Sequence, residues 1–411
     1  MNLFKLVVAY LKARPLNTLL NILLLSLGIA MITLLLVVNN QVQEKIADNT
    51  KGIDLVVGAK GSPLQLILCN VFHIDFPTGN IKLQDADKLA QHRLVKSAIP
   101  MALGDSYRNY RIIGTTHAYA TLYHAELASG MLWNTDMEVT LGANVAEQLG
   151  LKLGDKFVSA HGLSEAGHAH EAHPFIVKGI LQPTFNVLDN LILTNVSSIW
   201  LVHAHDAEDT AKPDSVTASV LVPTVLASDS TRELTSLLIK YRNPIAAIQL
   251  PRYINSQTSM QAASPSFEAA RLFSILGVGI EALTGFAYVL IFISALSIFL
   301  ALYNSLKERR YDLAIMRSMG ASRSKLLWAT QVEGITLTLC GSLVGILLGH
   351  GAIYLFTMLV AESATAGVSA LVFYEQELFL LAGSLVLGII CSVIPSWQAY
   401  RTDIHNVLAG N

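Results

Sequence analysis

The sequence predicts a membrane protein with four transmembrane α-helices and a large α+β domain between the first two of them. Three observations support this fold class. Charged residues make up only 14% of the 411 residues and hydrophobic residues 52%, whereas soluble domains carry about 25% charged residues. Four apolar stretches are long enough to cross a bilayer. A long segment of ordinary globular composition follows the first of these stretches.

The four apolar stretches set the order of the predicted segments. A bilayer core about 30 Å thick requires roughly 20 apolar residues in helical conformation. The first stretch exceeds the roughly 7–15 residues of a signal-peptide core, and no A-x-A-like site follows it, so we expect it to be retained. The predicted segments are a cytoplasmic amphipathic segment (1–15), the first membrane helix and a stalk (16–48), an external α+β domain (49–270), a stalk and the second membrane helix (271–303), a cytoplasmic loop (304–327), the third and fourth membrane helices (335–360 and 378–395) and a cytoplasmic tail (396–411).

The basic residues of the short loops predict the orientation, because Lys and Arg favour the cytoplasmic side. The N-terminal segment and the loop at 304–327 are rich in Lys and Arg. The loop between the third and fourth helices has no basic residue, and its charged residues are Glu362, Glu375 and Glu377. We therefore expect both termini and the loop at 304–327 to be cytoplasmic. The α+β domain is then outside the cell membrane, in the periplasm of a Gram-negative host.

The helical pattern of the first two membrane helices continues beyond the bilayer. Val42 and Ile46 follow the first helix at i, i+4 spacing, and an apolar pattern leads from Arg271 into the second helix without a breaker. This continuation predicts a helical stalk beneath the external domain. The alternative is a pair of tilted or kinked helices that end at the membrane.

The external segment alternates short β-rich runs with short helical runs, which predicts an α+β domain with a β-rich lobe near residues 101–215. Gly150 stands where a helix C-cap is expected. The predicted strands are 53–57, 95–100, 107–114, 175–181, 190–194, 216–222 and 245–250, and the predicted helices are 85–91, 143–149 and 231–241.

The chain carries no motif for catalysis or for nucleotide binding. The patterns G-x-S-x-G, H-E-x-x-H and G-x-x-x-x-G-K-[ST] are all absent, so an ATP-driven role requires a separate ATP-binding subunit. The net charge of −2 provides no basic surface for nucleic acid. Three cysteines are too few for a disulfide framework.

The loop at 304–327 contains a short amphipathic helix. Leu313, Ile315, Met316 and Met319 form one apolar side at helical spacing, Gly320 ends the helix, and Ser322 is a candidate N-cap for the next one. Two interpretations remain open. The helix rests on the bilayer interface beside anionic lipid, or it presents its apolar side to a groove on a cytoplasmic partner.

Residues 308–322 resemble the E-R-x-x-E-[IL]-[AG]-[IL]-[LM]-R-[AS]-[LM]-G-A-[ST] signature of FtsX-like permeases of ABC transporters, the macrolide-exporter and lipoprotein-releasing type. Asp312 occupies the usual Glu position. Residues 141–155 resemble the family's external-domain pattern L-G-x-x-[VL]-A-x-x-L-G-L-x-x-G-D, and residues 395–404 its tail pattern P-A-x-x-A-x-[RK]-x-[DN]-[PI]. The order of one helix, a domain and three further helices resembles the layout of this family across the whole chain.

The resemblance implies a non-catalytic permease of the bacterial inner membrane that pairs with a second copy around two ATP-binding subunits. ATP binding would move the cytoplasmic loop, and the stalk would carry that motion to the external domain for export or extraction of a lipophilic, lipoprotein or peptide-like substrate. The alternative within the family is a signalling permease that regulates a periplasmic partner. The resemblance assigns ATPase coupling to Glu308, Arg309, Asp312, Leu313, Ile315, Met316, Arg317, Met319 and Gly320.

The third membrane helix carries small residues and one histidine. Gly341, Gly345 and Gly349 lie four residues apart, which lets another helix approach closely, either within the chain or across a dimer interface. An ionisable residue inside the membrane, such as His350, is a functional candidate. The simpler interpretation is a neutral imidazole bonded to a neighbouring helix, because we expect no acidic partner at mid-membrane depth.

Four histidines cluster in one loop of the external segment. Imidazoles suit Zn²⁺, Cu²⁺ and Ni²⁺, and three interpretations remain open: a solvated loop with incidental metal affinity, a zinc site in a metal-responsive transporter, and a pH-responsive patch. No other bound cofactor is predicted. The histidines are His161, His168, His170 and His173.

Overall fold

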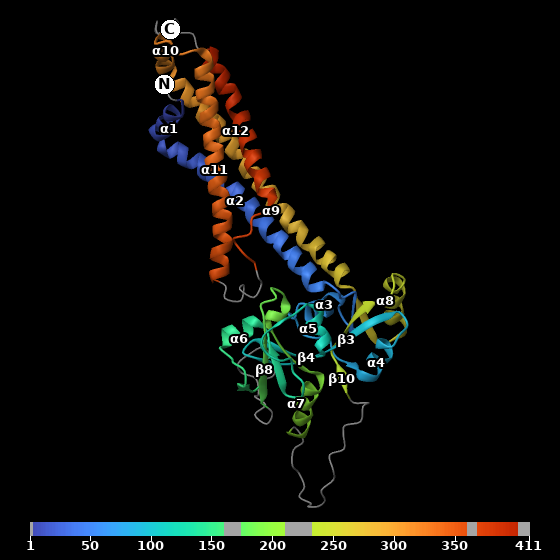
Figure 1. Ribbon diagram of the computed structural model, residues 1–411. Coiled ribbons are helices and arrows are strands. Elements are labelled where there is room, and N and C mark those ends of the chain that lie inside the picture. Colours follow the sequence, from blue (N-terminus) through green and yellow to red (C-terminus); the bar gives the residue numbers. More distant parts are fainter. Residues whose placement is uncertain (1–2, 160–173, 210–231, 360–367, 402–411) are drawn as a thin grey trace, which may run out of the picture. The chain divides into compact units, whose positions relative to one another are not determined.

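The computed structural model describes residues 3–159, 174–209, 232–359 and 368–401 (Figure 1). The chain divides into two compact units. We call residues 1–43 with 274–411 the membrane unit and residues 44–273 the globular unit. Each unit is described separately.

Four helices are long and apolar enough to cross a membrane, as the sequence predicts: α2 (Pro15–Thr50), α9 (Pro265–Glu308), α11 (Arg323–Leu359) and α12 (Glu375–Arg401). At 1.5 Å per residue, the 36 residues of α2 and the 44 residues of α9 extend for about 54 Å and about 66 Å. A bilayer core is only about 30 Å thick. The expected helical continuation of the first two membrane helices is therefore confirmed.

Two shorter helices complete the membrane unit. Helix α1 (Leu3–Ala13) precedes α2, and α10 (Arg310–Ser318) lies between α9 and α11. Helix α11 begins at Arg323 and not near residue 335, so the third membrane helix is longer than predicted. The core of this unit draws apolar side chains from all four long helices. Its buried members are Leu25, Ile29, Ile298, Leu302, Leu337, Ile346 and Cys391.

A mixed β-sheet organises the globular unit. The strand order is β12-β1-β11-β3-β4-β9-β6-β8-β5, with β7 paired to β8, and a separate pair joins β10 to β2. The strands are β1 (Leu55–Ala59), β2 (Ile81–Lys82), β3 (Val95–Tyr107), β4 (Tyr110–Thr115), β5 (Leu127–Gly130), β6 (Glu138–Leu141), β7 (Lys156–Phe157), β8 (Phe175–Leu181), β9 (Leu191–Asn195), β10 (Glu233–Leu234), β11 (Ser236–Tyr241) and β12 (Met260–Ala263).

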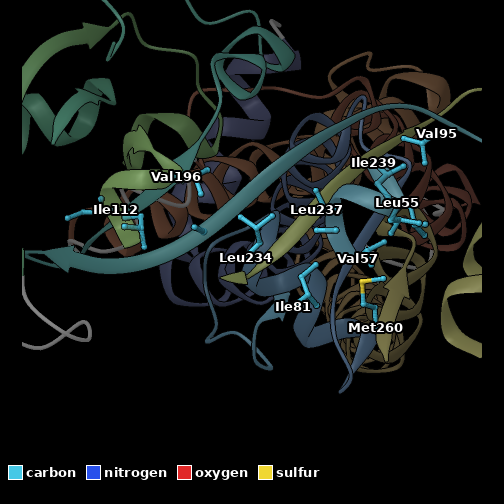
Figure 2. Packing of buried hydrophobic residues seen from close by; sticks show 14 of the residues in the cluster. Leu55, Val57, Ile81, Val95, Ile112, Val196, Leu234, Leu237, Ile239 and Met260 are labelled. Carbon is cyan, nitrogen blue, oxygen red and sulfur yellow. The ribbon is translucent and has the colours of Figure 1, made fainter. Parts of the chain in front are cut away.

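Strand β3 joins two parts of this sheet. Its first half pairs with β11, up to Met101, and its second half pairs with β4, from Ala102 onward. Buried side chains from both parts meet in one core, in which Leu55, Leu237 and Ile112 are labelled in Figure 2. The helices of this unit are α3 (Pro63–Asn70), α4 (Leu83–Ala90), α5 (His117–Leu122), α6 (Ala143–Leu149), η1 (Val187–Asn190), α7 (Val196–Asp209) and α8 (Ala246–Gln257).

Two predicted elements of the globular unit are wrong. The helix predicted at 231–241 is replaced, within the described residues, by β10 and β11, because β11 lies between β1 and β3 and is buried on both faces. Residues 245–250 belong to helix α8 and not to a strand, since Ala246, Leu250 and Ile254 are buried at helical spacing. The predicted strand at 216–222 lies outside the described residues.

The other predicted elements of this unit are present, although the strand predicted at 95–100 continues as β3 to Tyr107. Helix α6 has the predicted bounds, and Gly150 ends it with φ +65°, the left-handed conformation that glycine adopts most readily. The strand predicted at 107–114 is shorter than expected, because Arg108 and Asn109 form the turn between β3 and β4 with φ +46° and +71°.

Candidate functional site

The candidate site is the corner at which α9, α10 and α11 meet. Helix α9 ends at Glu308, and the backbone bond from Arg309 N to Ser305 O, 3.1 Å long, carries the turn into α10. Gly320, with φ +97°, ends α10, and Ala321 N donates to Met316 O at 3.0 Å. These bonds form the predicted glycine stop. Ser322 Oγ then accepts from Lys325 N at 3.4 Å, as expected of an N-cap.

The inner side of α10 is packed against the other helices of the membrane unit. Leu313 is 5% exposed, Met316 is 9% exposed and Ala314 is fully buried. They form a small core with side chains from α9, α11 and α12, which fixes the orientation of α10. The partners are Leu306, Leu326 and Ala399.

The outer side of α10 is apolar and exposed. Tyr311 is 59% exposed, Ile315 is 36% exposed and Met319 is 75% exposed. The sequence predicted one apolar side that combines Leu313, Ile315, Met316 and Met319. That prediction is wrong, because the helix has an inner and an outer apolar side and these residues divide between them.

Arg309 lies inside the corner and not on its surface. Its guanidinium is 3.7 Å from the Glu333 carboxylate, and both side chains are about nine-tenths buried. The guanidinium also lies 3.8 Å from the centre of the Tyr10 ring and donates to Tyr10 O at 3.3 Å. Arg309 therefore joins α1, α11 and the start of α10. A buried ion pair of this kind fixes geometry more than it adds net stability.

The other charged residues of the signature lie around these contacts of Arg309. Glu308 forms an ion pair with Arg14, the residue that precedes α2. Asp312 lies in the first turn of α10 and Arg317 in its last turn, where each charge suits the helix dipole. The sequence signature thus describes a charged corner that joins four helices, in addition to an exposed face.

Sequence reasoning missed the partners of Arg309. Glu333 and Tyr10 received no role, although an acid beside the apolar run of the third membrane helix requires a partner. That isolated carboxylate was the available signal. Two small cavities flank Arg309, and both are also lined by Leu302, Ser305 and Glu333.

The glycine stripe of α11 packs on α2 of the same chain. A Cβ atom added at Gly341 would lie 2.9 Å from Leu25, one at Gly345 would lie 2.7 Å from Ile29, and one at Gly349 would lie 2.9 Å from Thr33. The three positions are matched at four-residue intervals on both helices. Of the two open interpretations, packing within the chain describes this stripe.

His350 has an acidic partner, contrary to the sequence expectation. Its Nε2 is 3.0 Å from Glu377 Oε2, and its Nδ1 is 2.6 Å from Ala370 O. Glu377 lies in the first turn of α12, where it is 4% exposed. The sequence assigned Glu377 to the acidic loop between the membrane helices and so missed this pair.

The predicted histidine cluster at 161, 168, 170 and 173 lies outside the described residues. Within the described ranges, no group of three or more His, Cys, Asp or Glu side chains is arranged to hold a metal ion. The zinc site stays a prediction.

This arrangement defines a class of protein: a multi-pass membrane protein with four spanning helices, an α+β domain after the first, and a short two-sided helix between the second and third. Comparisons with known proteins give the family. Residues 18–250 match the MacB-like periplasmic core domain, and residues 284–404 match the FtsX-like permease C-terminal domain. The chain belongs to the FtsX/MacB-type family of ABC transporter permeases.

Individual relatives agree with this assignment. The chain is 32% identical over 99 residues to the uncharacterized ABC transporter permease YknZ of Bacillus subtilis, covering 24% of this chain and 23% of the relative. It is 21% identical over 316 residues to the macrolide export ATP-binding/permease protein MacB of Nitrobacter winogradskyi, covering 75% and 45%. The chain thus spans less than half the length of these relatives.

Among solved structures, the periplasmic region of MacB from Actinobacillus actinomycetemcomitans aligns with a TM-score of 0.34 and 14% identity. The alignment covers 56% of this chain and 97% of that chain. Family membership identifies the chain as a multi-pass membrane permease component of an ABC transporter.

Proposed function

We propose that this permease transmits mechanical motion from a cytoplasmic ATP-binding partner to its globular unit. In this proposal both termini and α10 are cytoplasmic, and the globular unit lies in the periplasm. The basic residues near α1 and α10 and the acidic residues near the start of α12 support that orientation.

The two-sided character of α10 is the observation that carries the proposal. Its inner side is buried in the membrane unit. Because this packing is tight, a displacement of α10 is transmitted to α9 and α11. Its outer side offers Tyr311, Ile315 and Met319 to a partner. A short helix with exposed apolar side chains suits a hydrophobic groove on another protein.

The connections at the far ends of α2 and α9 support transmission into the globular unit. Only Ser264 separates β12 from α9, and a short turn at residues 51–54 separates α2 from β1. Strands β1 and β12 pair with each other, from Val56 with Ala263 to Ala59 with Met260. Both long helices therefore continue into neighbouring strands, with no flexible linker to absorb motion.

The cargo class follows from the family and is part of the proposal. We propose export or extraction of a lipophilic, lipoprotein or peptide-like substrate by two copies of the permease acting together. The name of the Nitrobacter relative includes macrolide export. A signalling permease with the same mechanics, acting on a periplasmic partner, is the second candidate.

The test replaces the outer side of α10 and measures binding of the ATP-binding partner. The double variant Ile315→Lys/Met319→Lys should abolish co-purification, because a desolvated groove rejects charge. Lysine remains compatible with an anionic lipid surface, so insertion into the membrane should be unchanged. The variant Met319→Leu, which keeps the apolar surface, should co-purify normally.

The control places the same charge on an exposed apolar position outside α10. Trp328 on α11 is 55% exposed, and Trp328→Lys should still co-purify with the ATP-binding partner. Unchanged co-purification of the double lysine variant would contradict docking through α10 and favour the interpretation that the helix rests on lipid.

A further inference from the structure

A polar cluster, which we call the latch, ties the described segment before α12, residues 368–374, to α2 and α11. Gln41 of α2 bonds both backbone groups of Ser369: its Nε2 donates to Ser369 O and its Oε1 accepts from Ser369 N, each at 2.7 Å. His350 of α11 bonds Ala370 O and Glu377, as described above. Five residues from three helices and the segment thus form the latch.

The hydrogen-bond partners of His350 call for an additional proton in the latch. The carbonyl oxygen of Ala370 can only accept, so His350 Nδ1 carries a hydrogen. The 3.0 Å contact between Nε2 and Glu377 Oε2 then needs a second hydrogen, because an imidazole lone pair and a carboxylate oxygen repel each other. The other carboxylate oxygen, Oε1, already accepts from Tyr374 N at 3.0 Å.

We propose that the His350–Glu377 pair is a proton-binding site whose occupancy closes the latch. Whether the proton resides on the imidazole or on the carboxyl group, the loaded pair is neutral overall. Without the proton, a carboxylate that is 4% exposed faces the lone pair of an imidazole that is 7% exposed. An uncompensated buried charge is costly, so loss of the proton opens the latch.

Among the residues that the structure describes, the latch contains no other charged side chain to offset that charge. Helix α2 contributes the neutral amide of Gln41, and the segment contributes backbone groups and the Phe373 ring, centred 4.3 Å from the imidazole. On α12, Glu375 is exposed to its surroundings. The next titratable groups along α11 and α2 are Tyr354, which is 53% exposed, and Glu44.

The direction of the pH dependence follows from linkage. The closed latch holds one proton more than the unloaded pair. Closure therefore weakens as the pH rises and that proton is lost, by up to about tenfold per pH unit for one proton. In the closed state Gln41 joins α2 to the residues before α12, so proton concentration sets how firmly those residues are held.

The experiment uses hydrogen exchange of the full chain in lipid nanodiscs at pH 6.0 and pH 8.5. The amides of Ser369 and Tyr374, corrected for the intrinsic pH dependence of exchange, should lose protection at pH 8.5. Glu377→Gln imitates the protonated carboxyl group, since its amide can donate to Nε2 and accept from Tyr374 N. This variant should stay protected at both pH values.

The matched control is Glu375→Gln, which removes an exposed acid two residues away and should behave as the wild type. Gln41→Ala should lower protection at both pH values without changing their ratio, because Gln41 binds no proton. Corrected protection that is independent of pH in the wild type, or equally pH-dependent in Glu377→Gln, would overturn the proposal. The inference does not rest on the transport function.

Discussion

His73 illustrates, at the scale of one residue, how the globular unit holds a polar group in its core. The side chain is 9% exposed, its Nε2 lies 2.9 Å from Tyr119 Oη, and its backbone has φ +57°. Burial lowers the pKa of His73 to about 3, and the charge of Arg111 acts in the same direction. The folded protein therefore contains a neutral imidazole at this position.

This environment predicts that the globular unit loses stability in acid. Below pH about 6.5 the unfolded chain takes up a proton that folded His73 does not bind. The free energy of unfolding is therefore unaffected by protonation of His73 above pH about 6.5. It decreases as the pH falls toward 3, by up to about 5 kcal/mol. His73→Asn, which tolerates positive φ, should lower the acid-unfolding midpoint followed by tryptophan fluorescence.

His124 provides the control for that experiment, because it has φ +53° and an exposed side chain. His124→Asn changes the same residue type in the same backbone conformation and should leave the midpoint unchanged. Equal shifts for both variants would show that the acid sensitivity does not come from burial of His73.

At the scale of elements, the packing of α11 on α2 depends on small residues at fixed intervals. A side chain at Gly345 would meet the backbone oxygen of Ser26 at 2.8 Å as well as Ile29. Backbone atoms of a packed helix cannot move aside as a flexible side chain can. The two helices would have to separate.

We therefore expect Gly345→Leu to lower the thermal stability of the detergent-solubilised protein. The loss should be at least the typical cost of overpacking a core, about 1–3 kcal/mol. Gly351 lies on the same helix with nothing within 4 Å of an added Cβ, so Gly351→Leu should melt as the wild type does. If Gly345→Leu kept full stability and lost only dimer yield, the stripe would belong to a dimer interface instead.

The membrane helices and α6 were easier to predict than the central strand β11, for a physical reason. The membrane helices and α6 carry their signals locally, in apolar length, in periodicity and in the glycine that follows α6. Strand β11 carries none, because its Leu237, Leu238 and Ile239 face apolar neighbours on both sides of the sheet. A continuous apolar run of this kind does not distinguish a buried strand from a helix.

The candidate site was predicted in the same uneven way. The signature located α10 and its glycine stop, since these are local features. The division of its apolar residues into two sides, and the partners Tyr10 and Glu333 of Arg309, depend on contacts between segments far apart in the sequence. Apart from the isolated carboxylate of Glu333, contacts of that range leave no pattern in a single sequence.

At the scale of the whole molecule, the direct connection between β12 and α9 predicts that its stiffness matters for function. Two glycines inserted between Ser264 and Pro265 should leave binding of the ATP-binding partner intact. They should abolish nucleotide-dependent changes in hydrogen exchange within residues 55–263, because a flexible joint absorbs the motion.

The control insertion belongs at the turn formed by Arg108 and Asn109, between β3 and β4, which carries no connection to the membrane helices. Two glycines there should preserve the nucleotide-dependent exchange. A response that survives insertion at Ser264 would show that motion reaches the globular unit by another route.

The pairing of β1 also has a consequence for biogenesis. Val56 pairs with Leu238 on one side and with Ala263 on the other, so both neighbours are synthesised long after β1 itself. Hairpins within the sheet, such as β3 with β4, have partners close in sequence and form early. During synthesis the apolar strand next to the first membrane helix therefore waits with both edges unpaired, the state most prone to aggregation. The topology of the sheet therefore predicts that this strand is exposed to aggregation until residue 263 has been synthesised.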